Sequence, residues 1–351
     1  MRHCMRHCMR HLLNTLYLNI DGAYVARDGE TVDIRSEGRT LRKFPIHLFE
    51  NIVCFGRVSL SPGAMQLCAD HGVAVSFMSV YGRFIAKLTA PVHGNVLLRR
   101  LQYRKADDPI QSAQIARAII AAKIANSRTV LQRAARDGKE SEPYEQPIRN
   151  LAVQLQKIRV HAKPDLDTIR GIEGDSAGEY FSCFDHMILG EKEQFYFHGR
   201  NRRPPTDRIN ALLSFGYSLL ASEITSALET VGLDPCVGFL HRDRPGRPSL
   251  ALDLMEELRA YLVDRFVLSL VNLRKIAAAD FTVRENGAVL LNETPRKETF
   301  LQNWQNRKQE EITHPYLQEK IPLGLLPYVQ AMLLARFLRG DLDGYPPFFL
   351  K

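Results

Sequence analysis

The stretch HRDRPGRPSLALDLMEE, residues 241–257, places a histidine and three carboxylates on either side of a basic loop. In a helix, Asp253 would have Glu256 and Glu257 as neighbours on one face. Like charges packed together are unfavourable unless a cation or basic residues neutralise them. Carboxylate oxygens with one imidazole, here His241, suit Mg²⁺ or Mn²⁺. The stretch therefore indicates either a metal site beside an anion-binding loop or a solvated acidic helix face with a satisfied histidine.

A second acidic feature is RGIEGDSAGEYFSCF, residues 170–184. The spacing of Glu173, Ala177 and Tyr180 puts all three on one face of a helix. A carboxylate on that stripe would point inward, and Gly174 beside it permits close approach of backbone or phosphate. The alternative is a glutamate that is placed favourably against the dipole of its helix.

A basic loop precedes an apolar helix in FHGRNRRPPTDRINALLSFGYSLL, residues 197–220, and Asp207 is predicted to cap that helix. Guanidinium groups bind phosphate through two parallel hydrogen bonds, so the loop suits a nucleic-acid backbone. A merely solvated loop would have the same composition. The arginines of this loop are Arg200, Arg202, Arg203 and Arg208.

The composition is typical of a soluble globular protein, and the net charge favours an anionic binding partner. The chain has 351 residues, 45% hydrophobic and 25% charged, which is enough for two ordinary domains. Its net charge of +8 favours nucleic acid or an anionic membrane surface, although an ordinary basic surface gives the same charge. We expect no membrane-spanning helix and no secretory segment. The 6 scattered cysteines indicate no disulfide framework and a reducing cytoplasm.

The first residues, MRHCMRHCMRH, repeat every four positions and cluster potential zinc ligands. A structural zinc site draws its ligands from two elements that enclose the ion, and nothing nearby supplies the second. We therefore expect residues 1–8 to be a redundant or disordered start, with zinc binding as the alternative. The residues concerned are His3, Cys4, His7, Cys8 and His11.

Two domains are predicted, which makes the fold class α+β. Residues 9–92 alternate apolar and polar side chains around turn signals, which predicts a small, mainly antiparallel β-rich domain interrupted by one helix at SPGAMQLCADHG. A hinge is expected at residues 90–95. Residues 96–340 are predicted to form a larger, mainly α-helical domain, followed by a Pro- and aromatic-rich tail, residues 341–351, that is not helical.

Within the helical domain, DDP divides two long helices near the start, and ENG signals a hairpin in FTVRENGAVLLNETPRK. There is no GxxxxGK[ST] loop, no strand–GxGxxG–helix unit and no GxSxG elbow, so nucleotide hydrolysis and serine hydrolysis lack their usual motifs. The other predicted helices span residues 143–161, 165–187, 207–231, 250–276 and 323–339.

Four separated motifs, in order, resemble the CRISPR-associated integrase family, the first of the two universal Cas proteins. They are GIEGDSAGEYF, RNRRPPTDRINALLSFGYSLL, GFLHRDRPGRPSLALDL and the acids of DLMEE. The likeness extends from LLNTLYL through QNRKQEEITHPYL to LRGDLDGYPPF, which is essentially all of the chain after Met9. It is greatest for the subtype I-C members.

The resemblance implies a β-rich domain for dimerisation or partner binding and a helical catalytic domain. It also implies a metal-dependent DNA endonuclease and integrase that inserts captured fragments into a CRISPR array by attack of a DNA 3′-hydroxyl. Mg²⁺ or Mn²⁺ would be the cofactor. The implied partners are double-stranded DNA, a second copy of the chain and the small second universal Cas protein.

The same resemblance implies the residues of the site. Glu173, His241 and Asp253 match the catalytic, metal-ligating residues of the family. A further family acid, often aspartate, falls at Glu256, which leaves Glu256 doubtful as a ligand and Glu257 open. The DNA-binding residues, from the basic loop and from the resemblance, are Arg200, Arg202, Arg203, Arg247 and Arg259.

Two other functions stay open on the sequence. One is a metal-dependent DNA nuclease that acts in repair or degradation, and the other is a non-catalytic DNA-binding scaffold. Joined DNA products would identify an integrase, and nicks alone would identify a nuclease. A scaffold would bind DNA regardless of chelator and form no covalent product.

Overall fold

The computed structural model describes residues 15–18, 20–49, 51–79, 84–88, 96–138, 140–160 and 165–350. The histidines and cysteines of the N-terminal repeat lie outside these residues, so the expectations for that segment stay untested. The described cysteines are free thiols, as expected from their scatter: Cys54, Cys68, Cys183 and Cys236.

The chain divides into two compact units. The first contains Met1–Gly94 together with two later segments, Gln305–Glu310 and Pro322–Leu325. The second contains Asn95–Trp304, Glu311–Ile321 and Leu326–Lys351. Because strands fill the first unit and helices dominate the second, the predicted fold class is confirmed. The return of two late segments to the first unit was not predicted.

The first unit holds two four-stranded sheets, with strand orders β1-β5-β7-β8 and β4-β3-β2-β6. The expectation of mainly antiparallel pairing is wrong for the first sheet, where β1–β5 and β5–β7 are parallel. Parallel neighbours need a crossover, and helix α2 (Pro62–Asp70) supplies it between β5 and β7. The strands are β1 (Thr15–Leu18), β2 (Tyr24–Asp28), β3 (Thr31–Ser36), β4 (Arg39–Pro45), β5 (Asn51–Phe55), β6 (Ser59–Leu60), β7 (Ala74–Met78) and β8 (Phe84–Leu88).

The core of the first unit is drawn from both sheets and from α2. Val25, Ile34 and Ile52 of the strands and Leu67 of α2 are buried in one cluster. The segment Gln305–Glu310 is hydrogen-bonded to β1: the Gln305 side-chain amide donates to the Thr15 carbonyl at 3.1 Å.

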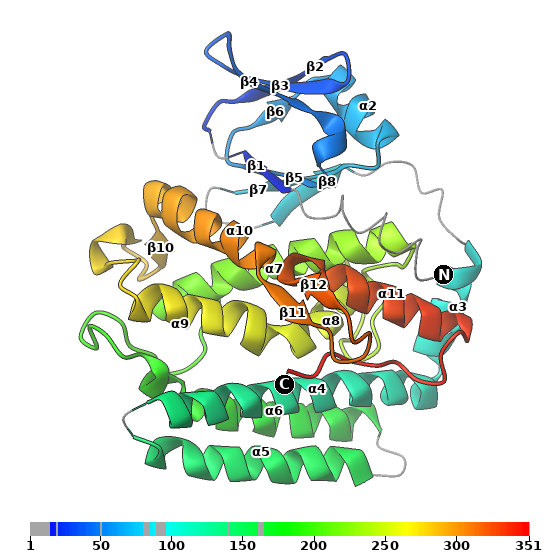
Figure 1. Ribbon diagram of the computed structural model, residues 1–351, viewed down its shortest axis with the longest axis vertical. Helices are drawn as coiled ribbons and strands as arrows, with labels where there is room; N and C mark the ends of the chain where they lie inside the picture. Colours follow the sequence, from blue (N-terminus) through cyan, green and yellow to red (C-terminus); the bar gives the residue numbers. More distant parts are fainter. Residues whose placement is uncertain are drawn as a thin grey trace. The chain divides into compact units, whose positions relative to one another are not determined.

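Helices dominate the second unit, where α4, α5 and α6 lie side by side (Figure 1). The predicted helices and the ENG hairpin are present, whereas α10 and the π-helix before it, Pro295–Leu301, were not predicted. The α-helices are α3 (Val96–Asp107), α4 (Pro109–Asp137), α5 (Glu142–Val160), α6 (Leu166–Ser182), α7 (Arg208–Val231), α8 (Ser249–Arg259), α9 (Arg265–Asn272), α10 (Gln302–Gln309) and α11 (Leu326–Arg339). The short strands are β9 (Phe281–Val283), β10 (Val289–Leu291), β11 (Glu311–Thr313) and β12 (Lys320–Pro322), and the 3₁₀ helices are Ile46–Leu48, Phe184–Met187, Ala278–Asp280 and Leu323–Leu325.

Helix α7 begins and ends at the residues that its sequence favours. The Asp207 carboxylate accepts from the Asn210 backbone N–H at 2.7 Å, which confirms the predicted cap, and Gly232 closes the helix in the left-handed region with φ 88°. By length and composition alone α7 could cross a membrane, a test that the buried core helix of a globular protein also passes. In the helical unit it packs against α8 and α11, and 61% of its most apolar window is buried.

Helices α8 and α9 follow one another without a loop, joined by a π-helical turn, Ala260–Asp264. A π turn inserts an extra residue and is frequent at functional sites. Helix α8 buries apolar residues such as Leu250 and Leu254, and three carboxylates are buried with them: Asp253, Glu256 and Glu257. The acidic stretch is therefore not a solvated helix face.

Candidate active site

The carboxylate of Asp253 is fully buried inside the backbone turn of residues 238–241. Its Oδ2 accepts from the backbone N–H groups of Phe239 and Leu240 at 2.6 and 3.0 Å. Its Oδ1 accepts from the backbone N–H of His241 at 3.0 Å and from Nδ1 of the same residue at 2.6 Å. A carboxylate only accepts, so Nδ1 carries a hydrogen and Nε2 is the ring nitrogen that this contact leaves open.

Gly238 permits this close approach. A Cβ at this position would lie 2.8 Å from Asp253 Oδ2 and 2.9 Å from the carbonyl carbon of Ser249. The second atom belongs to the backbone at the start of α8, so it cannot rotate away. Any side chain at position 238 would push the loop off the carboxylate.

Arg170 joins α6 to the same loop. Its Nε and Nη2 donate to the Leu240 carbonyl at 3.1 and 2.7 Å, and its Nη1 pairs with Asp167 at 2.6 Å. Glu173 follows about one turn later on α6. The loop that carries His241 and the helix that carries Glu173 are therefore held together by direct hydrogen bonds.

Glu256 lies among three positive or basic side chains. Lys123 Nζ of α4 forms ion pairs with Glu173 Oε1 and, at 2.7 Å, with Glu256 Oε2. Arg259 Nη2 is 3.0 Å from Glu256 Oε1, and His241 Nε2 is 4.0 Å from the same oxygen. Burial acts to raise the pKa of Glu256, but the charges of Arg259 and Lys123 outweigh it and lower this pKa to about 2. Glu256 is therefore ionised at neutral pH.

The donor atoms of this cluster suit a hard divalent cation. Among the residues that the structure describes, no three His, Cys, Asp or Glu side chains are grouped as ligands, and the carboxylates of this cluster pair with Lys123 and Arg259. Yet Glu256 Oε2 is buried without a hydrogen bond, although Lys123 is within ion-pair distance. This oxygen, the Glu173 carboxylate and His241 Nε2 form the mixture of oxygen and imidazole ligands that fits Mg²⁺ or Mn²⁺.

Glu257 points away from this cluster, toward the C-terminal tail. Its buried carboxylate accepts from the Tyr345 hydroxyl, from the Phe348 backbone N–H at 2.7 Å and from the Gln330 amide at 3.2 Å. Burial raises the pKa of Glu257 to about 7. Of the two adjacent glutamates, Glu256 is the one that faces His241.

A cavity of about 280 Å³ opens beside Glu256. It brings together four of the five arginines predicted to bind DNA, whereas Arg247 does not line it. Arg202 and Arg203 are exposed, and Arg208 of the same basic loop instead donates to the Gln194 carbonyl at 2.9 Å. The charged residues of the cavity wall are Lys123, Arg200, Arg202, Arg203, Glu256, Arg259 and Asp264.

Tyr217 organises the arginines of this cavity. The guanidinium groups of Arg200 and Arg259 lie over its ring, 5.1 and 5.3 Å from the centroid. Its hydroxyl donates to Asp264 at 2.5 Å, and Tyr180 donates to the same carboxylate at 3.1 Å. Burial raises the pKa of Asp264 to about 6, since the two tyrosines and the nearby arginines offset only part of the desolvation.

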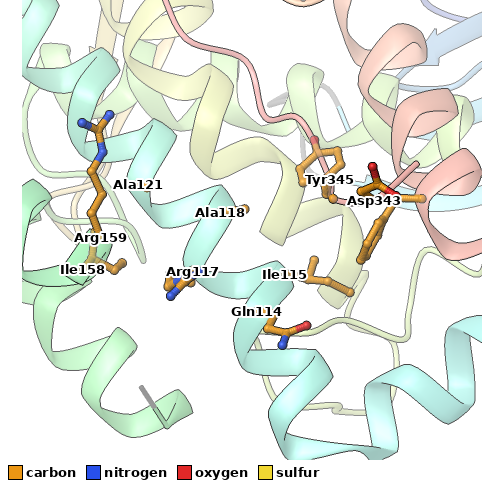
Figure 2. A pocket seen from close by; sticks show the side chains of 11 residues that line it. Gln114, Ile115, Arg117, Ala118, Ala121, Ile158, Arg159, Asp343 and Tyr345 are labelled. Atoms are coloured by element: carbon orange, nitrogen blue, oxygen red, sulfur yellow. The ribbon is translucent and has the colours of Figure 1, made fainter. Parts of the chain in front are cut away.

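A larger cavity of about 480 Å³ lies between α4, α5, α11 and the C-terminal tail. Figure 2 shows it from close by, with Ile115 of α4, Arg159 of α5 and Tyr345 of the tail around it. None of the predicted site residues lines this cavity.

Sequence reasoning missed several residues of the site. Lys123 is a single charge within the apolar run IIAAKIA, and Asp264 is a single acid within AYLVDRFV. A lone charge in a buried stretch must be paired, and that signal could have marked both positions. Arg170, Tyr217 and Gly238 carry no such signal, because their roles depend on segments that are distant in the sequence.

Comparisons with known proteins find similarity along nearly the whole chain. A family model described as CRISPR associated protein Cas1 matches residues 16–306. A relative from Chlorobaculum tepidum, named CRISPR-associated endonuclease Cas1 1, is 50% identical over 338 residues, which cover 96% of this chain and 98% of the relative. A solved CAS1 protein from Thermotoga maritima is 25% identical with a TM-score of 0.79, covering 93% of this chain and 97% of its own. A casposase bound to an integration product is 26% identical with a TM-score of 0.80, covering 95% and 93%.

Substitution of Gly238 by alanine should destabilise the protein by about 1–3 kcal/mol, because the new Cβ overlaps α8 backbone. Gly178→Ala in α6 is the matched control, since nothing lies within 4 Å of its Cβ, and it should be neutral or up to about 1 kcal/mol stabilising. Urea denaturation measures both. Equal stability of Gly238→Ala and the unsubstituted protein would contradict the close approach.

Substitution of Asp264 by asparagine should remove a pH dependence of stability. The folded-state pKa of about 6 exceeds the ordinary value of 3.8, so the folded protein binds this proton more tightly than the unfolded chain. The stabilisation is therefore complete below about pH 4 and is lost as the pH rises through about 6. Relative to Asp264→Asn, the free energy of unfolding should fall by about 3 kcal/mol between pH 4 and 7 in urea titrations. Parallel pH profiles for the two proteins would refute this.

Proposed function

Because the chain belongs to the CRISPR associated protein Cas1 family, we propose that it is a metal-dependent DNA endonuclease and integrase that inserts captured fragments into a CRISPR array. The observation that carries the proposal is that Lys123 pairs with both Glu173 and Glu256, and His241 lies 4.0 Å from Glu256, beside a cavity lined by arginines. The name of the Chlorobaculum relative supports nuclease chemistry. The casposase, which is bound to an integration product, supports integration.

We propose that Glu173, His241 and Glu256 hold one Mg²⁺ or Mn²⁺ ion. Asp253, predicted from the sequence as a ligand, has both oxygens engaged by the turn of residues 238–241. Its proposed role is therefore to orient His241, as a carboxylate often does for a metal-binding imidazole. When bound, the ion would stabilise charge on the scissile phosphate and on the leaving oxygen.

The protein's own residues then position the reactants. Asp253 accepts from Nδ1 of His241, so Nε2, which lies 4.0 Å from Glu256 Oε1, is the nitrogen that would hold the ion. Arg259 and Lys123 keep Glu256 ionised. Exposed Arg202 and Arg203 would neutralise the phosphates of DNA that enters the cavity.

The proposed reaction is a transesterification. A 3′-hydroxyl attacks phosphorus and forms a new P–O bond, while the P–O bond to the 3′-oxygen of the cut strand breaks. The attacking hydroxyl loses a proton, and the leaving oxygen takes one up and departs as a 3′-hydroxyl. Water in place of the hydroxyl would give strand cleavage instead.

The remaining expectations also belong to this proposal. The substrates are double-stranded spacer fragments and the repeat of the array. The chain is proposed to act in the cytoplasm as a homodimer that binds the small second universal Cas protein, in a system of subtype I-C. Contact of Arg247 with DNA stays a prediction.

Removal of the proposed ligands should abolish metal-dependent strand transfer. Glu173→Gln, His241→Ala and Glu256→Gln should each lose about a hundredfold or more in activity, and Asp253→Asn about tenfold to a hundredfold. The assay incubates the protein with array-bearing plasmid, duplexes with free 3′ ends and Mn²⁺, and it counts joined products.

The matched control for these variants is Glu179→Gln, on α6 with Glu173 but hydrogen-bonded to Asn150 instead. Joined products that need the metal support an integrase. Nicks alone would leave only a nuclease, and full activity of Glu256→Gln would overturn the ligand assignment.

Loss of the exposed arginines should weaken DNA binding through the phosphates. Arg202→Gln and Arg203→Gln should each reduce the slope of log affinity against log salt by about one. Arg149→Gln, an exposed arginine of α5 outside the cavity, is the control. Fluorescence anisotropy with a labelled duplex measures the slopes, and identical slopes for all four proteins would contradict a phosphate path through the cavity.

A further inference from the structure

The C-terminal tail, residues 341–350, has no regular secondary structure and yet is partly buried. Helix α11 ends at Arg339, and Gly340 turns the chain in the left-handed region with φ 85°. Tyr345 and Phe348 are then only 7% and 2% exposed. An irregular segment that buries two aromatic side chains has been fixed in place by specific contacts.

Those contacts converge on Glu257 of α8. Tyr345 donates its hydroxyl to Glu257, and the Phe348 backbone N–H donates to the same carboxylate at 2.7 Å. Gln330 of α11 donates to Glu257 at 3.2 Å and lies 2.8 Å from the Tyr345 hydroxyl. His314 Nε2 is 2.9 Å from the Gln330 oxygen, which orients the amide.

Asn126 of α4 completes the attachment. Its amide donates to the backbone carbonyls of Glu257 and Phe348 at 2.7 and 2.8 Å, and its oxygen accepts from the Leu350 N–H at 2.7 Å. One buried side chain therefore joins α4, α8 and the tail.

This attachment involves the same two helices, α4 and α8, that carry Lys123 and Glu256. Asn126 follows Lys123 by three residues on α4, and Glu257 follows Glu256 on α8. Two contacts therefore join α4 to α8. One is the ion pair of Lys123 with Glu256, and the other is the hydrogen bond from Asn126 to the Glu257 backbone carbonyl.

We propose that the C-terminal tail is a strap that sets the position of Glu256, with Tyr345, Gln330 and Glu257 as positioning residues. The strap holds α8 at Glu257, the residue that follows Glu256. This proposal rests on the proposed function, in which Glu256 holds a divalent ion. A loosened strap would let α8 turn and would weaken that ion's binding without touching it.

Tyr345 also forms part of the wall of the larger cavity (Figure 2). Removal of its hydroxyl leaves the ring, and therefore the wall, in place. Tyr345→Phe consequently tests the hydrogen bond to Glu257 rather than the packing of the tail.

The experiment measures Mn²⁺ affinity of the full chain without DNA, by electron paramagnetic resonance, together with the melting temperature in chelator. Tyr345→Phe should bind Mn²⁺ roughly threefold to tenfold more weakly than the unsubstituted protein, with unchanged duplex affinity in chelator. Gln330→Met, which removes the amide donor, should weaken Mn²⁺ binding by a similar factor and leave duplex affinity unchanged. Leu151→Val, a buried position in α5, should lower the melting temperature and leave Mn²⁺ affinity unchanged.

A double-mutant cycle tests the route through Glu257. If Tyr345 acts through that carboxylate, Tyr345→Phe should cause little further loss of Mn²⁺ affinity once Glu257→Gln is present. Additive losses, or unchanged Mn²⁺ affinity in both tail variants, would overturn the strap even if stability falls. Failure of the unsubstituted protein to bind Mn²⁺ would refute the proposed function itself, which separates the two results.

Discussion

The burial of one carboxylate, Asp253, inside a backbone turn is the constraint on which the site depends. A charge without solvent is costly unless hydrogen bonds replace the water, and four donors from residues 239–241 do so here. The turn can close this tightly only because position 238 is glycine. Once closed, the turn fixes both the place of His241 and the ring nitrogen that carries its hydrogen. The Leu240 carbonyl of that turn then anchors Arg170, and with it the helix of Glu173.

Helix α8 accommodates three buried carboxylates because each is satisfied in a different way. Asp253 is bound by backbone N–H groups, Glu256 by the cations Lys123 and Arg259, and Glu257 by neutral donors near the tail. The consequences differ accordingly, since the pKa falls to about 2 at Glu256 and rises to about 7 at Glu257. Adjacent positions on one helix thus provide an ionised group for the cluster and, for the strap, a carboxyl group whose pKa is about 7.

Local patterns in the sequence predicted local structure well. The hairpin at ENG, the helix breaks and the cap at Asp207 all depend on neighbouring residues, and the structure confirms them. Family resemblance singled out Glu173, which pairs with Lys123, and His241, which lies 4.0 Å from Glu256. The lone charge of Lys123 could have been noticed, but its partner could not be read from the pattern, because Lys123 is 50 residues from Glu173 in the sequence. The parallel pairing of β1, β5 and β7 was missed for a related reason, since strand alternation does not encode strand direction.

The first unit has a consequence for how the chain is made. Its sheets come from the first residues, but Gln305–Glu310 and Pro322–Leu325 belong to it as well, and Gln305 bonds to Thr15 across 290 positions. A growing chain on the ribosome cannot form that contact until most of the helical unit has been synthesised. The N-terminal unit is therefore completed late in translation, and a gene fragment that ends near residue 94 would encode it without its two closing segments.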